Sequence, residues 1–201
     1  MTGEGVRPDP TFQRLEREYR YRGRIASVSA DRIRLPGGHE ATYEIVHLPS
    51  AVAVVPILEE GAEPEVILIE QFRASLEGYI HEIPAGILEP GEDPAACAAR
   101  ELAEETGYEA RSIRHLVTVF PTPGTSDHRM HFYLAEGLTR GEQRLEPGEC
   151  LSVKPVKLAD LVRWLLEPPM PGASGQRPVI VDAKTHIGVL HAHLRRTGTG
   201  G

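Results

Sequence analysis

The stretch "GILEPGEDPAACAARELAEETGY", residues 86–108, places three glutamates, Glu101, Glu104 and Glu105, within five residues. Its alanine, leucine and glutamate content predicts a helix over residues 93–106. Crowding like charges on one helix costs electrostatic free energy. Another feature of the protein must therefore offset the repulsion among the three carboxylates.

The ends of this helix are marked in the sequence. Asp93 is a good capping residue, and Pro94 suits the first helical position, where a missing N–H costs nothing. Gly107 can adopt the left-handed conformation that ends a helix. At about 100° per residue the three glutamates share one face. The expected core face, about 60–160° round from Glu101, consists of Ala95, Ala98, Ala99, Leu102 and Thr106.

Two interpretations of the acidic face follow from the residues alone. One is a solvated face, the usual explanation for a run of charge. The other is a site for hard divalent cations, which bind clustered carboxylates. No lysine or arginine follows any of the glutamates at a spacing of four residues, and Arg100 offsets only part of their charge. The solvated face therefore fits poorly, but the helix alone does not decide between the two.

The residues before the helix extend the pattern. Gly86 and Glu92 stand at fixed spacings ahead of Arg100, the glutamates and Gly107. The whole arrangement resembles the signature of the Nudix hydrolases at every defined position. The resemblance implies an α/β/α sandwich, Mg²⁺ or Mn²⁺, and hydrolysis of a nucleoside diphosphate linked to another moiety.

The resemblance also implies roles for individual residues. The expected metal ligands in this segment are Glu101, Glu104, Glu105 and the backbone carbonyl of Ala85. The residues expected to shape the loop and helix are Gly86, Glu92, Arg100 and Gly107. Bound cations would neutralise the diphosphate and activate a water molecule to attack one phosphorus.

Features outside this box resemble the ADP-ribose pyrophosphatase branch of the family, over residues 19–195. They are "YRGRI", "EQFR", "EIPAGILEPGE" and "FPTPGTSD". This branch implies cleavage of ADP-ribose to AMP and ribose 5-phosphate. Arg73 matches an arginine that contacts the substrate, and the other expected substrate contacts are Ile87, Pro123, Gly124 and His128.

The sequence departs from that branch at two places. His128 stands where a substrate-contacting glutamate is common, and an imidazole N–H donates where a carboxylate accepts, so the terminal sugar is left open. A surface loop histidine is the alternative interpretation of His128. The late acidic loop, "RLEPGECLSV", carries only Glu146 and Glu149. Glu149 is the expected fourth metal carboxylate, and either Glu149 or Glu146 is the expected general base.

Composition narrows the classes of partner. The formal net charge of −7 argues against duplex DNA and anionic membranes as partners. The two cysteines form no CxxC pair, and the N-terminus has no apolar signal region. A cytoplasmic protein without a disulfide framework is therefore expected.

Apolar runs predict buried strands at residues 51–58 and 65–73, and later segments predict two further strands and two helices. Strands interleaved with about three helices indicate an α/β (α+β) fold with a mixed sheet between helices. Residues 1–48 are expected to be an N-terminal region of antiparallel strands used for dimerisation, and residues 49–201 the Nudix domain. The branch implies a homodimer in which N-terminal strands exchange.

Rival functions remain. The nearest is hydrolysis of another nucleoside diphosphate sugar, such as GDP-mannose, or broad specificity. A non-catalytic ADP-ribose sensor belongs to a different class, and the intact box and the lack of a basic recognition helix argue against it.

Overall fold

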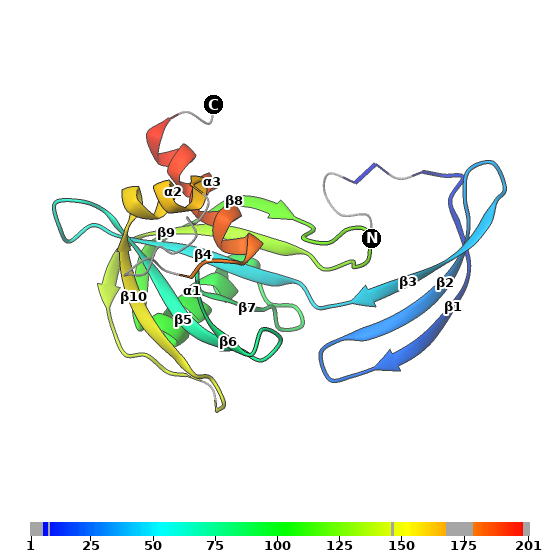
Figure 1. Ribbon diagram of the computed structural model, residues 1–201, viewed down its shortest axis with the longest axis horizontal. Helices are drawn as coiled ribbons and strands as arrows, with labels where there is room; N and C mark the ends of the chain where they lie inside the picture. The colour runs from blue at the N-terminus through cyan, green and yellow to red at the C-terminus, as the bar shows by residue number, and fades with distance from the viewer. Residues whose placement is uncertain (1–5, 8, 146, 168–178, 199–201) are drawn as a thin grey trace. The chain divides into compact units, whose positions relative to one another are not determined.

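A computed structural model describes residues 6–7, 9–145, 147–167 and 179–198 of the 201-residue chain. The chain divides into two compact units (Figure 1). The first contains residues 1–49 and 120–129, and the second contains residues 50–119 and 130–201.

The first unit is built on a three-stranded antiparallel sheet in the order β1–β2–β3. The strands are β1 (Gln13–Arg22), β2 (Ser27–Arg34) and β3 (Glu40–His47). Residues 120–129 return to this sheet, where Val46 N–H donates to the carbonyl of Thr125 at 2.8 Å. The segment "PGGH", residues 36–39, joins β2 to β3, and Gly37 and Gly38 adopt positive φ there.

A buried carboxylate holds this sheet together. The Asp31 side chain on β2 has no exposed surface and pairs with Arg14 and Arg17 of β1, at 2.9 and 2.6 Å. The hydroxyl of Ser29 donates to it at 2.7 Å. The hydrogen bonds from Arg17 outweigh burial and hold the pKa of Asp31 at about 2. The charged form of Asp31 therefore stabilises the fold.

We expect Asp31→Asn to lower the free energy of unfolding by about 2 kcal/mol at pH 7, because the arginines lose a buried charged partner. Because the pKa of Asp31 is lower in the folded state than in the unfolded state, its ionised form stabilises the fold at pH values above the unfolded-state pKa. This stabilisation is lost as pH falls, here between about pH 4 and pH 2. The deficit of the variant should therefore shrink over that window in urea unfolding followed by circular dichroism. Glu18→Gln, which breaks an exposed pair with Arg20, is the control, with a cost below about 0.5 kcal/mol. A deficit that stays constant from pH 7 to pH 2.5 would contradict this assignment.

The second unit is built on a seven-stranded mixed sheet. Its main path runs β10–β5–β4–β9–β8, with β6 paired to β5 and β7 paired to β4. Only the β4–β9 pairing is parallel. The strands are β4 (Ala51–Leu58), β5 (Glu65–Arg73), β6 (Gly78–Glu82), β7 (Ala85–Ile87), β8 (Tyr108–Val119), β9 (Met130–Arg140) and β10 (Leu151–Lys157).

Helices cover both faces of this sheet (Figure 1). The helices are α1 (Pro94–Thr106), α2 (Leu158–Leu166) and α3 (Ala183–Thr197). Val52 and Val54 of β4 pack with α1, whereas Ala53 and Val55 pack with α2 and α3. Every residue of β4 is buried, as expected for a strand enclosed on both sides. The α/β/α sandwich predicted from the sequence is confirmed.

Strands β4 and β5 diverge, and this divergence makes room for the site. They pair only at Ile57–Val66 and Leu58–Glu65. Beyond that point β6 pairs with the end of β5, and β7 pairs with the start of β4. The short segment between β6 and β7 therefore crosses the gap, fixed by a hydrogen bond of 2.9 Å from Val54 N–H to the carbonyl of Pro84.

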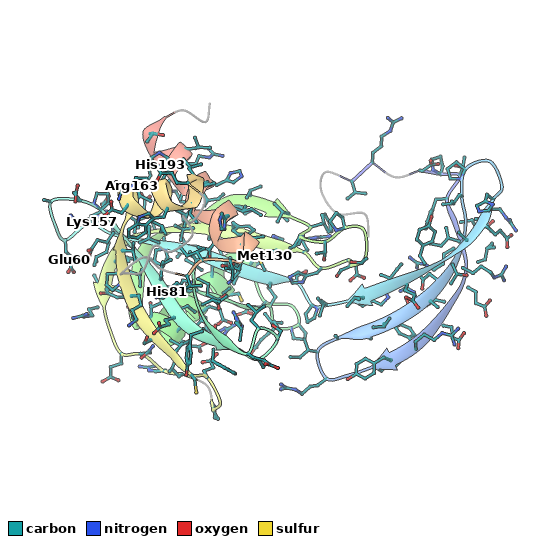
Figure 2. All side chains as sticks on the ribbon, viewed as in Figure 1. Glu60, His81, Met130, Lys157, Arg163 and His193 are labelled. Atoms are coloured by element: carbon teal, nitrogen blue, oxygen red, sulfur yellow. The ribbon has the colours of Figure 1, made fainter. Side chains whose placement is uncertain are left out.

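Residues just before α3 are tied to this region. The backbone of Val179 accepts from His81 N–H at 2.8 Å and donates to the His81 ring at 3.1 Å. His81 lies on β6 and is labelled in Figure 2. The hydroxyl of Thr185 accepts from Ile83 N–H at 3.0 Å. A side chain at Gly188 would lie 2.7 Å from Ile83, so α3 packs closely on the segment that follows β6. In the residues described, no helix has the length and apolar content needed to span a membrane.

Candidate active site

Helix α1 begins and ends as its sequence predicts. The side chain of Asp93 accepts hydrogen bonds from Ala95 N–H and Ala96 N–H at 3.0 and 3.1 Å. Gly107 ends the helix with φ 71°, in the left-handed region. The capping residues therefore fix where the helix begins and ends, and with that the position of each glutamate along it.

The burial of α1 corrects one sequence expectation. Ala99, assigned to the core face, is exposed, whereas Cys97 is fully buried. Glu101 and Glu105 are also buried, with 9% and 3% of their surface exposed. The acidic face is therefore turned largely into the protein, and the solvated-face interpretation is wrong for these two residues.

A cavity of about 490 Å³ lies beside this face, within the second unit. It brings together residues far apart in sequence, from the end of β5, from β7 and the following loop, from α1 and from the loop before β10. Its lining includes Gln71, Arg73, Ala85, Gly86, Ile87, Arg100, Glu101, Glu104, Glu105 and Glu149.

Glu105 lies deepest among the three helix glutamates. One carboxylate oxygen accepts a hydrogen bond of 3.0 Å from Ala85 N–H. Burial raises the pKa of Glu105 to about 8, and the nearby carboxylates of Glu101, Glu149 and Glu82 add to the rise. The site therefore opposes the anionic form that the helix concentrates there.

Glu101 depends on the absence of a side chain at Gly86. A Cβ at Gly86 would lie 1.9 Å from the carboxyl carbon of Glu101. Burial raises the pKa of Glu101, and the carboxylates of Glu104 and Glu149 add to this, while Arg100 opposes it. The glycine expected to shape the loop thus lets β7 approach the helix.

Arg100 joins the loop to the helix. Its guanidinium donates to both carboxylate oxygens of Glu92, at 2.9 and 3.1 Å. These hydrogen bonds hold the pKa of Glu92 at about 2. A third nitrogen donates to Glu101 at 2.8 Å and to Glu104 at 2.9 Å. One cation thus ties the loop and partly compensates two of the clustered carboxylates.

These contacts bear on metal binding. Within the described residues, no group of three or more His, Cys, Asp or Glu side chains is arranged to hold a metal ion as it stands. The hydrogen bonds of the three helix glutamates account for this arrangement. Glu105 accepts from Ala85 N–H, and Arg100 donates to Glu101 and Glu104. The donor set nevertheless fits a hard divalent cation. Several carboxylates line one cavity, and their charges help to raise the pKa of Glu101 and of Glu105, which a cation would relieve.

Arg73 lines the cavity and pairs with a buried glutamate in an ion-pair chain that the sequence did not predict. Its guanidinium donates to Glu82 of β6, which is 1% exposed, and Lys184 of α3 donates to the other oxygen of Glu82. Lys184 also pairs with Asp182 at 3.0 Å. Lys184 follows Glu82 by 102 residues, so no local pattern could reveal the pair.

Gln71 is a second missed residue of the lining. Its side-chain oxygen is buried and has no hydrogen-bond partner within the described part of the chain, and it lies on the strand that carries Arg73. A buried acceptor without a donor is costly, so this oxygen marks a place where a bound group can donate.

The remaining expected residues divide between the two units. Glu149 lines the cavity, and Glu146 lies outside the described residues. Pro123 and Gly124 line a different cavity of about 470 Å³ inside the first unit, with Phe12, Tyr43 and Ile45.

His128 lines neither of these two cavities among the described residues. Its Nδ1 lies 2.8 Å from the carbonyl of Pro49, and its backbone N–H donates to Ser126 at 3.1 Å. Its ring is therefore engaged with the neighbouring backbone.

Comparison with known proteins agrees with this geometry. A model of the NUDIX domain matches residues 47–181, and one of the nucleoside diphosphate sugar hydrolase N-terminal domain matches residues 12–46. A methanol dehydrogenase activator of Bacillus methanolicus is 36% identical over 181 residues, covering 90% of this chain and 92% of that protein. An ADP-ribose pyrophosphatase of Bacillus subtilis (strain 168) is 34% identical over 183 residues, covering 90% and 92%.

A solved structure supports the fold. The crystal structure of an ADP compounds hydrolase matches with a TM-score of 0.78, covering 97% of this chain and 99% of that chain, at 23% identity. The matched domain model spans more than half of the chain, and two relatives that share about a third of its residues align over most of its length. The chain belongs to the Nudix hydrolase family.

Proposed function

We propose that the protein is a Mg²⁺-dependent hydrolase that cleaves the diphosphate of ADP-ribose into AMP and ribose 5-phosphate. The observation that carries the proposal is that the buried carboxylates of Glu101 and Glu105 share one cavity with the partly buried Glu149 and with Arg73. Carboxylates suit a divalent cation and an arginine suits a phosphate, so the pair fits a diphosphate bound through metal. The relative named ADP-ribose pyrophosphatase supports the choice of substrate.

Glu101, Glu104, Glu105, Glu149 and the carbonyl of Ala85 would hold the metal, with Mn²⁺ as an alternative ion. When bound, a divalent cation neutralises phosphate charge and lowers the pKa of water. The residues of this chain supply orientation. Arg73 is held by Glu82 and is directed at the substrate by that ion pair. Its charge-assisted contact would position the diphosphate against the carboxylates.

A loop glutamate completes the proposed chemistry. Hydrolysis requires a base that removes a proton from the attacking water. Glu149 lies close enough to Glu101 and Glu105 to raise the pKa of both carboxyls. It therefore suits either the fourth metal position or the base, with Glu146 as the other candidate for the base.

We further propose that residues 1–48 mediate a homodimer. The first unit exposes several large apolar side chains on its strands and the adjoining loops, and exposed apolar surface often marks an interface. They are Phe12, Tyr19, Tyr21, Ile25 and Tyr43. The match of residues 12–46 to an N-terminal domain model supports a distinct role for this region. The free thiols of Cys97 and Cys150 suit the reducing cytoplasm that we propose as its location.

The metal proposal predicts thermal stabilisation. Saturating Mg²⁺, at about 100 times its Kd, should raise the Tm by about 5–10 °C, because only the folded chain presents the carboxylates together. Glu105→Gln should leave the metal-free Tm unchanged or higher, since it removes a buried repulsion, and should abolish most of the Mg²⁺ response. Glu44→Gln, an exposed change on β3, is the control and should respond like wild type. An equal Mg²⁺ response in the Glu105 variant would contradict the assignment.

The substrate proposal predicts a ranked hydrolysis screen. With Mg²⁺, ADP-ribose should yield AMP and ribose 5-phosphate, detected by chromatography, faster than GDP-mannose and other nucleoside diphosphate sugars. Glu105→Gln should reduce the rate by at least about 10²-fold, because several kcal/mol of charge stabilisation is lost. Preference for another sugar would transfer the proposal to that substrate. Tight ADP-ribose binding that is insensitive to EDTA, with no turnover, would indicate a sensor.

A further inference from the structure

The last carbonyls of α1 need hydrogen-bond donors from outside the helix. The last carbonyls of a helix have no partner within it, and α1 has no basic residue in its last turn. Gly107 N–H donates to the carbonyl of Ala103 at 2.9 Å, which leaves the carbonyls of Glu104 and Glu105 to be satisfied from outside. These two residues carry two of the clustered carboxylates.

Residues 141–144, which we call the clasp, supply the missing donors. Arg144 N–H donates to the carbonyl of Glu104 at 2.9 Å. The side-chain amide of Gln143 donates to the carbonyl of Glu105 at 2.6 Å. Gly141 N–H donates to the carbonyl of Gly107, also at 2.6 Å. The clasp therefore hydrogen-bonds three carbonyls at the C-terminal end of the helix that carries the carboxylates.

Gly107 lets the clasp approach this closely. A Cβ at Gly107 would lie 2.8 Å from the backbone nitrogen of Gln143 and 3.2 Å from the carbonyl carbon of Glu142. Glycine is thus required at this position for two reasons. It adopts the left-handed φ of 71°, and any side chain there would collide with the clasp.

The clasp leads directly into the acidic loop before β10. Glu149 follows Arg144 by five residues and lines the carboxylate cavity. The far end of this loop is also fixed, because Phe72 N–H donates to the carbonyl of Cys150 at 3.3 Å. The loop is thus held at one end to α1 and at the other to β5, the strand of Arg73.

We propose that the clasp sets the position of Glu149 relative to the carboxylates of α1, and that Gln143 is its positioning residue. Gln143 contributes the clasp's side-chain hydrogen bond, so it can be changed without altering the backbone. The catalytic part of this inference rests on the proposed function, whereas the structural part does not.

A neutral variant without a donor isolates the effect. Gln143→Met keeps the length of the side chain and should lower kcat about three- to tenfold, the size expected for one partly exposed hydrogen bond, with KM within twofold. Gln143→Lys restores a donor and should recover most of the rate. Glu142→Gln, the adjacent exposed residue, is the control and should match wild type. An effect of Gln143→Met on KM alone, or a Gln143→Lys variant that does not recover the rate, would overturn the positioning role.

A double variant tests whether the effect passes through Glu149. In a Glu149→Gln background, Gln143→Met should cost less than twofold in kcat, because the group that it positions is already disabled. The same cost in both backgrounds would overturn the proposal, since Gln143 would then act independently of the loop.

Hydrogen exchange separates this inference from the proposed function. In Gln143→Met, peptides covering residues 141–150 should exchange faster while those covering the middle of α1 stay unchanged. This outcome needs no substrate, so it supports the clasp even if ADP-ribose is not hydrolysed. Unchanged exchange at residues 141–150 would overturn the clasp whatever the enzyme cleaves.

Discussion

The burial of two carboxylates on one helix face is the constraint on which this structure depends. Glu101 and Glu105 are almost excluded from water, and burial together with neighbouring carboxylates raises the pKa of each. The protein offsets only part of this cost, through Arg100 and the N–H of Ala85. Buried like charges usually persist where their electrostatic strain serves a function. Their proposed counterweight is the divalent cation that would bind a diphosphate.

The sheet turns this helix face into a site. Because β4 and β5 part after two residue pairs, β6 and β7 fill the gap and bring Glu82 and Ala85 beside the helix. Glu82 then joins Arg73 to Lys184, so that α3, on the opposite face of the sheet, fixes a side chain of the cavity. Both helical layers therefore contribute to the site, although only α1 carries the signature.

Local features could be predicted from the sequence, and long-range ones could not. The caps of α1 and the buried strand β4 depend on neighbouring residues, and both match the structure. Helical angle alone misplaced Ala99, because the angle does not say which side the sheet covers. The Glu82–Lys184 pair and the contact of Gln143 with α1 join residues 102 and 38 positions apart, so only the folded chain reveals them.

The central claim is that the cavity beside α1 is a divalent cation site. Its most direct test is the anomalous signal of Mn²⁺ in crystals of the protein. The account predicts density in contact with Glu101, Glu105 and the carbonyl of Ala85, with these carboxylates turned from their present hydrogen bonds toward the ion. Mn²⁺ density found only elsewhere, with Glu105 still bonded to Ala85 N–H, would contradict it.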